Sequence, residues 1–324
     1  MKRIVAAALA VLGVVVFAAP VPAQQYPSRT VTIIVPYPAG GPTDTTAREV
    51  ANFLTKKLGQ SFIVENVTGG STIIATGRLA HAAPDGYTLL MHNLQIAANV
   101  TLFKTLPFDT EKAIVPVMLV NQNPLVIVGR PGLPANNLKE LIALMKKERL
   151  KEALPGIGTT GHLASALFAQ VANVQIDFIP YRGAAPAMND LLGGHVDLFV
   201  GTPQSVVSLV ESGKLKAYAV SAKEKLPRMP SAESLVDALG PKFDIVFWQG
   251  MFAPAGTPEN VITAINAALQ AAVSDPGVLK TWAEQGFAPF PKDQRSIAAA
   301  NAMMKSEIAR WGQVIRDNKI EASP

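Results

Sequence analysis

Apolar and polar residues along this chain change repeatedly from strand-like to helix-like spacing. Residues 31–35 form an apolar strand pattern, and from 44 to 58 the apolar positions recur on one helical face. The same alternation predicts further strands at 62–64, 87–91, 125–128, 174–178, 195–200, 216–221 and 245–252, and helices at 72–80, 138–150, 161–172, 186–193, 202–213, 258–272 and 296–317. Alternating strands and helices predict an α/β fold, with mainly parallel sheets flanked by helices.

Two segments fit places where the chain crosses between two such units. One is residues 121–124, and the other is the apolar run at 247–254. Two crossings predict a discontinuous first domain, residues 24–123 and 250–324, with a second domain, 124–249, inserted into it. A hinge of few strands and a cleft between two lobes usually follow from this arrangement.

The first 23 residues have the pattern of a secretory signal peptide. Lys2 and Arg3 precede an apolar run from Ile4 to Ala19, and small residues follow near Ala23. We therefore expect export to the periplasm and cleavage near Gln24. Removal of Lys2 and Arg3 leaves 27 of the 29 Lys and Arg against 24 Asp and Glu, a net charge of +3 in place of +5.

Composition excludes several classes of function. The chain is 49% hydrophobic and 16% charged, which is typical of a folded protein. It has no cysteine, so disulfides and thiolate metal sites are excluded. The histidines at 81, 92, 162 and 195 show no metal-binding spacing, and we expect no metal. The mild positive charge is not gathered in basic runs with aromatic residues, and no nucleic acid partner is expected.

Three glycine-rich loops carry the candidate chemistry: residues 37–44, 156–163 and 181–186. Each lies between a strand pattern and a helix pattern, where the first N–H groups of the helix have no partner within the helix and can bind an anion. Such loops meet at the carboxyl edge of a parallel sheet. The predicted ligand-binding residues are Tyr37, Ala39, Gly40, Gly41, Asp44, Asn93, Thr159, Thr160, His162, Gly183, Ala184 and Ala185.

Some of these residues also fit plain structural roles. Thr43 or Asp44 suits the N-cap of the following helix, and a carboxylate there would repel an anion unless it accepts a hydrogen bond from the ligand. His162 suits packing or capping as well as it suits ligand contact. Arg182 lies at a strand end and is not expected to be the main anchor.

The sequence resembles a known family of binding proteins. Segments in matching order, spread over essentially the whole mature chain, include Ala39-Gly40-Gly41-Pro42-Thr43-Asp44, Ala83-Pro84-Asp85-Gly86-Tyr87-Thr88-Leu89-Leu90-Met91, Pro180-Tyr181-Arg182-Gly183-Ala184-Ala185-Pro186-Ala187 and Ala253-Pro254-Ala255-Gly256-Thr257-Pro258. They are similar to the substrate-binding proteins of tripartite tricarboxylate transporters, the Bug family. The resemblance implies a two-lobed periplasmic binding protein of the type II-like fold, which captures a small carboxylate through backbone amides and waters.

The resemblance also implies a partner and the absence of catalysis. Ligand would be delivered to a two-component membrane permease or to a sensor protein, and we expect a monomer without a cofactor. A dinucleotide is a minor alternative, because Gly156–Gly161 matches G-x-G-x-x-G but Asp177 lies inside the next strand pattern. An enzyme for a small organic acid on a similar scaffold is the second alternative, although no nucleophile motif is present. A transcriptional effector domain of related fold is the third, and the predicted secretion signal argues against it.

Overall fold

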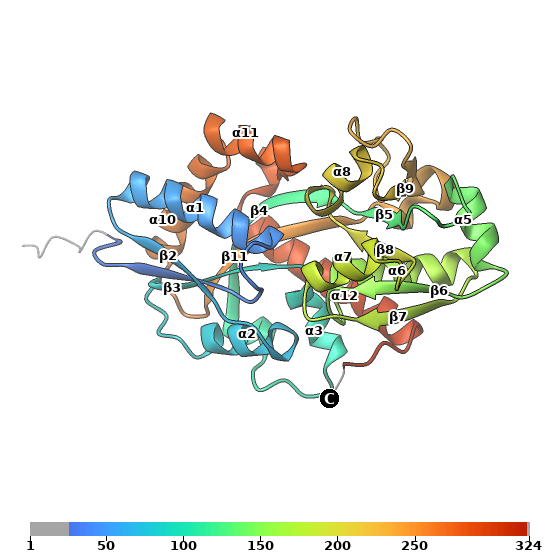
Figure 1. The fold of residues 1–324 in the computed structure, drawn as a ribbon. Helices are drawn as coiled ribbons and strands as arrows, with labels where there is room; N and C mark the ends of the chain where they lie inside the picture. The colour runs from blue at the N-terminus through green and yellow to red at the C-terminus, as the bar shows by residue number, and fades with distance from the viewer. Residues whose placement is uncertain (1–25, 323–324) are drawn as a thin grey trace, which may run out of the picture.

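The computed structural model describes residues 26–322, in which the strands form two six-stranded sheets (Figure 1). The predicted signal segment, with its cleavage near Gln24, lies outside the described residues. The first sheet has the order β12-β4-β11-β3-β1-β2, and the second has the order β10-β9-β5-β8-β6-β7. The strands are β1 (Val31–Val35), β2 (Phe62–Asn66), β3 (Thr88–Asn93), β4 (Ile114–Pro124), β5 (Val126–Gly129), β6 (Leu150–Leu154), β7 (Ile176–Pro180), β8 (Leu198–Gly201), β9 (Lys216–Val220), β10 (Glu233–Ser234), β11 (Val246–Pro254) and β12 (Ala288–Pro289).

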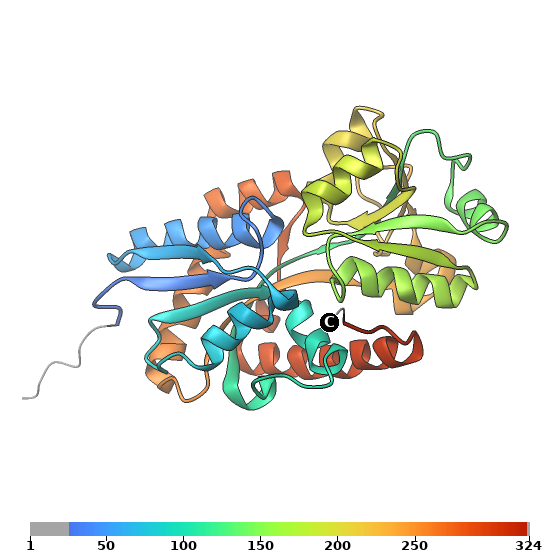
Figure 2. The ribbon, with the colours of Figure 1, turned by 60° about the horizontal axis from the view of Figure 1, so that its bottom comes forward.

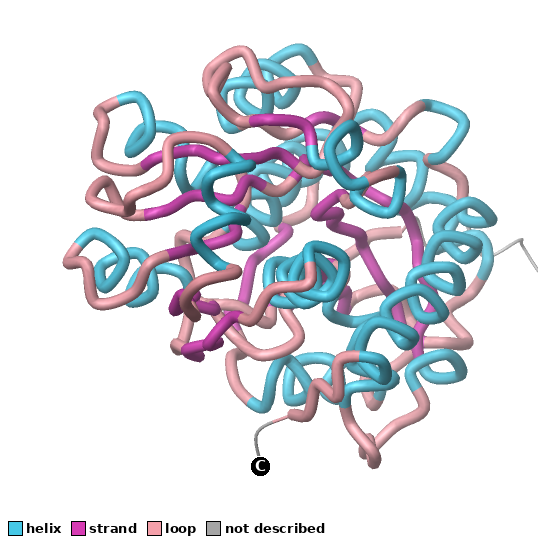
Figure 3. The backbone as a smooth tube through the Cα atoms, turned by 90° about the vertical axis from the view of Figure 1, so that its right-hand side faces the viewer, coloured by secondary structure: helices cyan, strands magenta, loops and turns pink. Residues whose placement is uncertain are grey.

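Helices surround both sheets, with the strands inside (Figure 3). This confirms the α/β, two-lobed fold class. The helices are α1 (Pro42–Leu58), α2 (Ile73–Ala80), α3 (Gln95–Leu102), α4 (Thr110–Ala113), α5 (Leu138–Met145), α6 (Thr160–Ala172), α7 (Ala184–Leu192), α8 (Pro203–Glu211), α9 (Leu235–Leu239), α10 (Glu259–Ala272), α11 (Pro276–Gln285) and α12 (Ile297–Asp317), with short 3₁₀ turns at Gly70–Thr72, Pro241–Phe243 and Lys292–Gln294.

Strand pairing is more mixed than the predicted mainly parallel sheets. In the first sheet β1 is parallel to β2 and β3, but β11 is antiparallel to both β3 and β4, and β12 is antiparallel to β4. In the second sheet only β5 is antiparallel to its neighbours, which are β8 and β9. The reason is the connection between the lobes: β4 carries the chain out of the first sheet and β11 brings it back in the opposite direction.

The two crossings lie side by side and share one serine. β4 ends at Pro124, directly before the second sheet, and Ile245 immediately precedes β11. The buried Ser221 hydroxyl accepts from the N–H of Leu125 at 2.7 Å and donates to the carbonyl of Ile245. Figure 2 shows the strands that connect the lobes. The domain boundaries expected from the sequence stay a prediction.

Helix α12 runs beneath both lobes (Figure 2). It packs against α3 and β4 of the first lobe and contacts α6 of the second. Within it, the buried Glu307 carboxylate accepts the indole N–H groups of Trp248, on β11, and Trp311 at 2.9 and 2.8 Å. The last helix therefore holds a strand that connects the lobes.

One predicted helix is too long. The expected helix at 138–150 ends as α5 at Met145, and Leu150 begins the strand β6, which the pattern did not predict. Four charged residues, 146–149, separate the two elements. Leu150 continues the apolar spacing of the helix by chance, but its side chain is buried in the second sheet.

Candidate functional site

The first loop, residues 37–44, leads from β1 into α1. This helix begins at Pro42, with Gly41 at the N-cap and no side-chain hydrogen bond at the cap. A cap by Thr43 or Asp44 is therefore wrong, because both residues lie within the first turn of the helix. Pro42 suits the first helical position, where a missing N–H costs no hydrogen bond.

Asp44 shapes this loop from within. Its buried carboxylate accepts from the N–H of Gly40 and from the side-chain amide of Asn66, each at 2.8 Å, and it pairs with Arg48. Burial alone would raise the pKa of the Asp44 carboxyl, but the hydrogen bonds from Arg48, Gly40 and Asn66 outweigh it and hold that pKa below its usual value. The Gly40 N–H, an expected ligand donor, is thus already occupied.

The second loop, residues 156–163, leads from β6 into α6. Thr159 is the N-cap of α6, and its hydroxyl donates to the carbonyl of Gly156 at 2.9 Å and accepts from the N–H of His162. The side chain of Thr159 therefore holds the loop and the helix end together.

His162 also belongs to the framework of this loop. Its Nδ1 accepts from the N–H of Gly158 at 3.1 Å, and its ring packs edge-on against Phe178 with the centroids 4.8 Å apart. Burial lowers the pKa of His162 to about 4, so the ring is neutral at pH 7 and can accept that hydrogen bond. These contacts favour packing over ligand contact.

The third loop, residues 181–186, leads from β7 into α7. Gly183 is the N-cap at a φ of +117°, and its N–H donates to the carbonyl of Pro155 at 3.1 Å. Arg182 is exposed. In each loop a glycine N–H is used internally, and the donors left without an intrahelical partner belong to the first helical turns. They include the N–H groups of Thr43, Asp44, Thr160, Gly161, Ala184 and Ala185.

The structure brings the three loops together where the lobes meet. Gln95, at the start of α3, donates from its side chain to the carbonyl of Ile157 at 3.1 Å and accepts from the Tyr37 hydroxyl at 3.2 Å. A methyl group built on Gly183 would lie 3.8 Å from the ring of Pro38. Figure 1 places α1 and α7 on either side of this boundary. The sequence-predicted residues of all three loops therefore share one region.

Asn93, at the end of β3, joins the first loop to the sheet. Its carbonyl accepts from the Tyr37 hydroxyl at 2.7 Å, and its amide approaches the Thr43 hydroxyl at 3.4 Å. Burial raises the pKa of Tyr37 well above its usual value and lowers the pKa of the neighbouring His92 to about 3. This part of the site is therefore polar but uncharged at pH 7.

A set of buried polar groups was not predicted from the sequence. Six side chains have buried polar atoms with no hydrogen-bond partner within residues 26–322: Asn99, Asn121, Asn123, Thr160, Gln204 and Gln249. Of these, Thr160 alone was a predicted site residue. An unpaired buried polar group costs about 1–3 kcal/mol, so such groups point to a partner outside the chain. Amides that interrupt apolar strand patterns, as at 121, 123 and 249, are the signal that could have found them.

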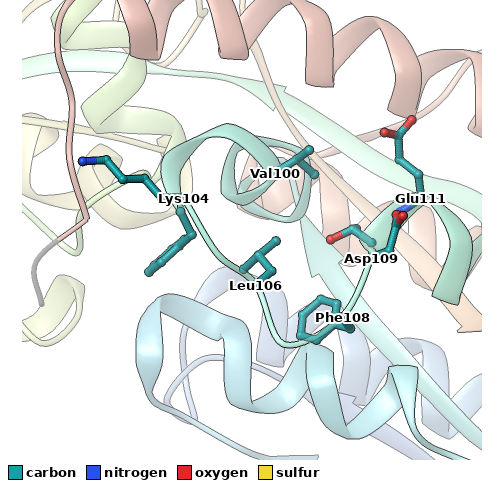
Figure 4. Close-up of a pocket in the computed structure, with 8 residues that line it drawn as sticks. Val100, Lys104, Leu106, Phe108, Asp109 and Glu111 are labelled. Atoms are coloured by element: carbon teal, nitrogen blue, oxygen red, sulfur yellow. The ribbon is translucent and has the colours of Figure 1, made fainter.

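A pocket of about 310 Å³ lies elsewhere, between α3 and α4 (Figure 4). Val100, Leu106 and Phe108 form its apolar part, with Lys104 and Asp109 at its rim. It contains none of the predicted site residues and no buried polar atom without a partner. This pocket is therefore not the candidate site.

Two further features bear on function. Among the described residues, no group of three or more His, Asp or Glu side chains is placed to hold a metal ion. In the same part of the chain, no helix combines the length and the apolar character that a membrane span requires.

Comparison with known proteins identifies a family and similar relatives. The sequence model of the family described as "Tripartite tricarboxylate transporter family receptor" matches residues 46–320. Protein BugT of Bordetella pertussis is 34% identical over 320 residues, covering 95% of this chain and 96% of BugT.

Two solved structures share the fold. The periplasmic binding protein BugD is 33% identical, with a TM-score of 0.84 over 92% of this chain and 100% of BugD. MatC of Rhodopseudomonas palustris, solved with bound malate, is also 33% identical, with a TM-score of 0.82 over 90% of this chain and 100% of MatC.

Proposed function

The chain belongs to the tripartite tricarboxylate transporter receptor family, and from this membership we propose that it binds a small carboxylate between its two lobes and passes it to a membrane protein. The family consists of substrate-binding proteins and not of enzymes. MatC, a relative with the same fold, holds malate. We infer that the cargo of this chain is likewise a small organic acid in the periplasm.

The observation that carries the proposal is the meeting of three helix starts from opposite lobes. α1 belongs to the first lobe, and α6 and α7 belong to the second. Each helix start presents N–H groups without intrahelical partners and the positive end of the helix dipole, which together favour an anion. Gln95 links the first loop to the second through its hydrogen bonds with Tyr37 and Ile157, and Gly183 of the third loop lies close to Pro38 of the first.

Residue roles follow from the hydrogen bonds inside the loops. We assign ligand contact to the first-turn N–H groups of α1, α6 and α7 and to the Thr160 hydroxyl, whose buried oxygen has no partner among the residues that the structure describes. Gly41, Ala184 and Ala185 provide close backbone approach, and Tyr37 and Asn93 line the site. The remaining predicted residues shape the loops around it: Ala39, Gly40, Asp44, Thr159, His162 and Gly183.

Motion and delivery complete the proposal. The lobes act as two domains, with boundaries near residues 124 and 249, and they close on the ligand about the strand connections beside Ser221. Closure excludes water and strengthens each hydrogen bond to the carboxylate. The N-terminal segment directs export, the mature protein is a monomer, and the closed form docks on a two-component permease or on a sensor.

Calorimetric titration tests the proposal. The purified protein is titrated with monocarboxylates, dicarboxylates, tricarboxylates, amino acids and aromatic acids, and at least one acid is expected to bind. Thr160→Val removes a hydroxyl that has no hydrogen-bond partner within residues 26–322, so it should leave the melting temperature unchanged and weaken binding at least tenfold. Thr281→Val is the control, because Thr281 lies half-buried on α11 and its hydroxyl donates to the carbonyl of Gly277, away from the three loops. No binding by any acid, or unchanged affinity in Thr160→Val, would contradict the proposal.

A further inference from the structure

Three buried amide side chains gather on the strands that connect the lobes. Asn121 and Asn123 lie on β4, and Gln249 lies on β11. Gln249 is the antiparallel partner of Asn121 on one side and of Asn93, on β3, on the other. Directly paired residues project from the same face of a sheet, and so do residues two apart on one strand. Asn121, Asn123 and Gln249, here called the amide patch, therefore share one face.

The amide patch is buried but not satisfied. Asn121 and Gln249 are 0% exposed and Asn123 is 2% exposed. The amide nitrogen of Asn121 donates to the Thr46 hydroxyl at 3.1 Å. The other five polar atoms of the patch, three acceptors and two amide donors, have no partner in the part of the chain that the structure describes. Native proteins seldom leave so many buried polar atoms unpaired, which points to a partner from outside the chain.

The amide patch continues directly from the proposed carboxylate site. Asn121 contacts Thr46, and Asn93, beside Gln249, approaches Thr43. Both threonines lie near the start of α1, whose N–H groups face the ligand in the proposed function. The patch therefore contacts the first turns of α1, beside the proposed carboxylate site.

The hydrogen-bonding groups of the amide patch disfavour a ligand that carries a second carboxylate at its far end. Within the range 26–322, no Lys or Arg is among the buried polar residues, and the side chains of the patch carry no charge. A carboxylate only accepts hydrogen bonds, so it would leave three amide oxygens unpaired and face them with negative charge. A primary carboxamide donates two hydrogen bonds and accepts others, which matches a patch of three acceptors and two donors.

Resting on the proposed function, we propose that Asn121, Asn123 and Gln249 bind the far end of the ligand, and that this end is an uncharged carboxamide. The ligand class is the half-amide of a short dicarboxylic acid: the carboxylate lies at the helix starts and the amide lies on the patch. This would set the chain apart from MatC, whose bound malate carries two carboxylates.

The preference for a half-amide is tested with pairs of ligands, in which the diacid and its half-amide have the same chain length. Succinate, glutarate and adipate are titrated at pH 7 beside their half-amides, succinamate, glutaramate and adipamate. At the length that fits, the half-amide should bind at least tenfold more tightly than the diacid. The corresponding ω-amino acids and ω-hydroxy acids, tested in parallel, should both bind more weakly than the half-amide.

Substitutions assign the preference to the patch. Asn123→Leu and Gln249→Leu keep the volume and remove the amide, so each should reduce the half-amide preference to less than threefold while the protein stays folded. Gln122→Leu, on the opposite face of β4, is the matched control and should keep the preference.

The outcomes separate this proposal from the proposed function. Binding of a diacid as tightly as its half-amide, or a preference that survives both leucine variants, overturns the role of the amide patch while carboxylate binding stands. Binding of other acids only, with no diacid and no half-amide bound, overturns it in the same way. If no acid binds at all, the proposed function fails as well.

Discussion

Gln95 of the first lobe donates its side-chain amide to the backbone carbonyl of Ile157 in the second lobe at 3.1 Å. The same side chain accepts from Tyr37. One buried amide therefore links the first loop, the start of α3 and the second loop, and it does so across the boundary between the lobes. Interactions of this kind bias the balance between open and closed arrangements of the lobes.

Replacing Gln95 by leucine should open the ligand-free protein. The change removes one interlobe hydrogen bond, which contributes about 0.5–1.5 kcal/mol. Small-angle X-ray scattering should show a larger radius of gyration. Gln170→Leu is the control, because Gln170 joins α6 to the residue after α12 through an exposed contact with Asn318 far from the loops. Identical scattering from Gln95→Leu and the unaltered protein would contradict this role of Gln95.

Alanine variants of two glycines with the same φ angle distinguish the cost of backbone strain from the cost of a steric clash. Gly158 and Gly194 both have a φ of +76°, but a methyl group on Gly158 would lie 2.4 Å from Leu102, and one on Gly194 would meet nothing within 4 Å. Alanine at either site adds backbone strain of about 1–2 kcal/mol. Only Gly158→Ala also displaces Leu102 of the other lobe, adding about 1–3 kcal/mol. Urea denaturation of the two variants should show this difference, and equal losses would refute it.

Glu307 should be critical for stability. Its carboxylate accepts two buried indole N–H groups, from Trp248 and Trp311. Glu307→Leu leaves both donors unpaired, so the free energy of unfolding should fall by about 2–5 kcal/mol. Glu307→Gln retains a carbonyl acceptor and should lose less than half as much. Denaturation followed by tryptophan fluorescence measures both, and similar losses in the two variants would exclude this explanation.

A buried carboxyl in the second lobe should make stability depend on pH. Burial raises the pKa of Glu152 from 4.5 to about 8, although the Ser165 hydroxyl donates to it at 2.6 Å. Between these values the folded chain keeps a proton that the unfolded chain has released. The contribution of Glu152 to stability is therefore fully present below pH 4.5 and is lost as the pH rises through 8.

Glu152→Gln should flatten this dependence. The amide keeps an acceptor for Ser165 but cannot ionise, so the variant should be more stable than the unaltered protein at pH 8. Between pH 7 and 8 the unaltered protein should lose up to about 1.4 kcal/mol per pH unit more than the variant. Buried His92 and His162 do not disturb this window, because their pKa values are lowered and they ionise in the unfolded chain only near pH 6.5. Parallel pH profiles would rule out Glu152 as the cause.

The loops were predictable because their signals are local. Glycine at turns, proline at helix starts and threonine at caps report backbone conformation within a few residues. Residues such as Thr159 and Gly183 were therefore placed at helix starts from the sequence, and the structure has them at N-caps. The hydrogen bonds that the N–H groups of Gly40, Gly158 and Gly183 donate within the chain were not predictable, because spacing alone did not show which atoms accept them.

The sequence by itself determined the alternation of strands and helices, the apolar faces, the glycine-rich loops and a resemblance that led to the family. These follow from periodicity and turn chemistry, which act over short stretches of chain. Only the tertiary structure decided that β4 and β11 run antiparallel between the lobes, that Gln95 reaches Ile157, and that Asn121, Asn123 and Gln249 share one buried face. The β4 and β11 partners lie more than a hundred positions apart, and Gln95 lies 62 positions from Ile157. Such contacts depend on strand register and direction, which no local pattern encodes.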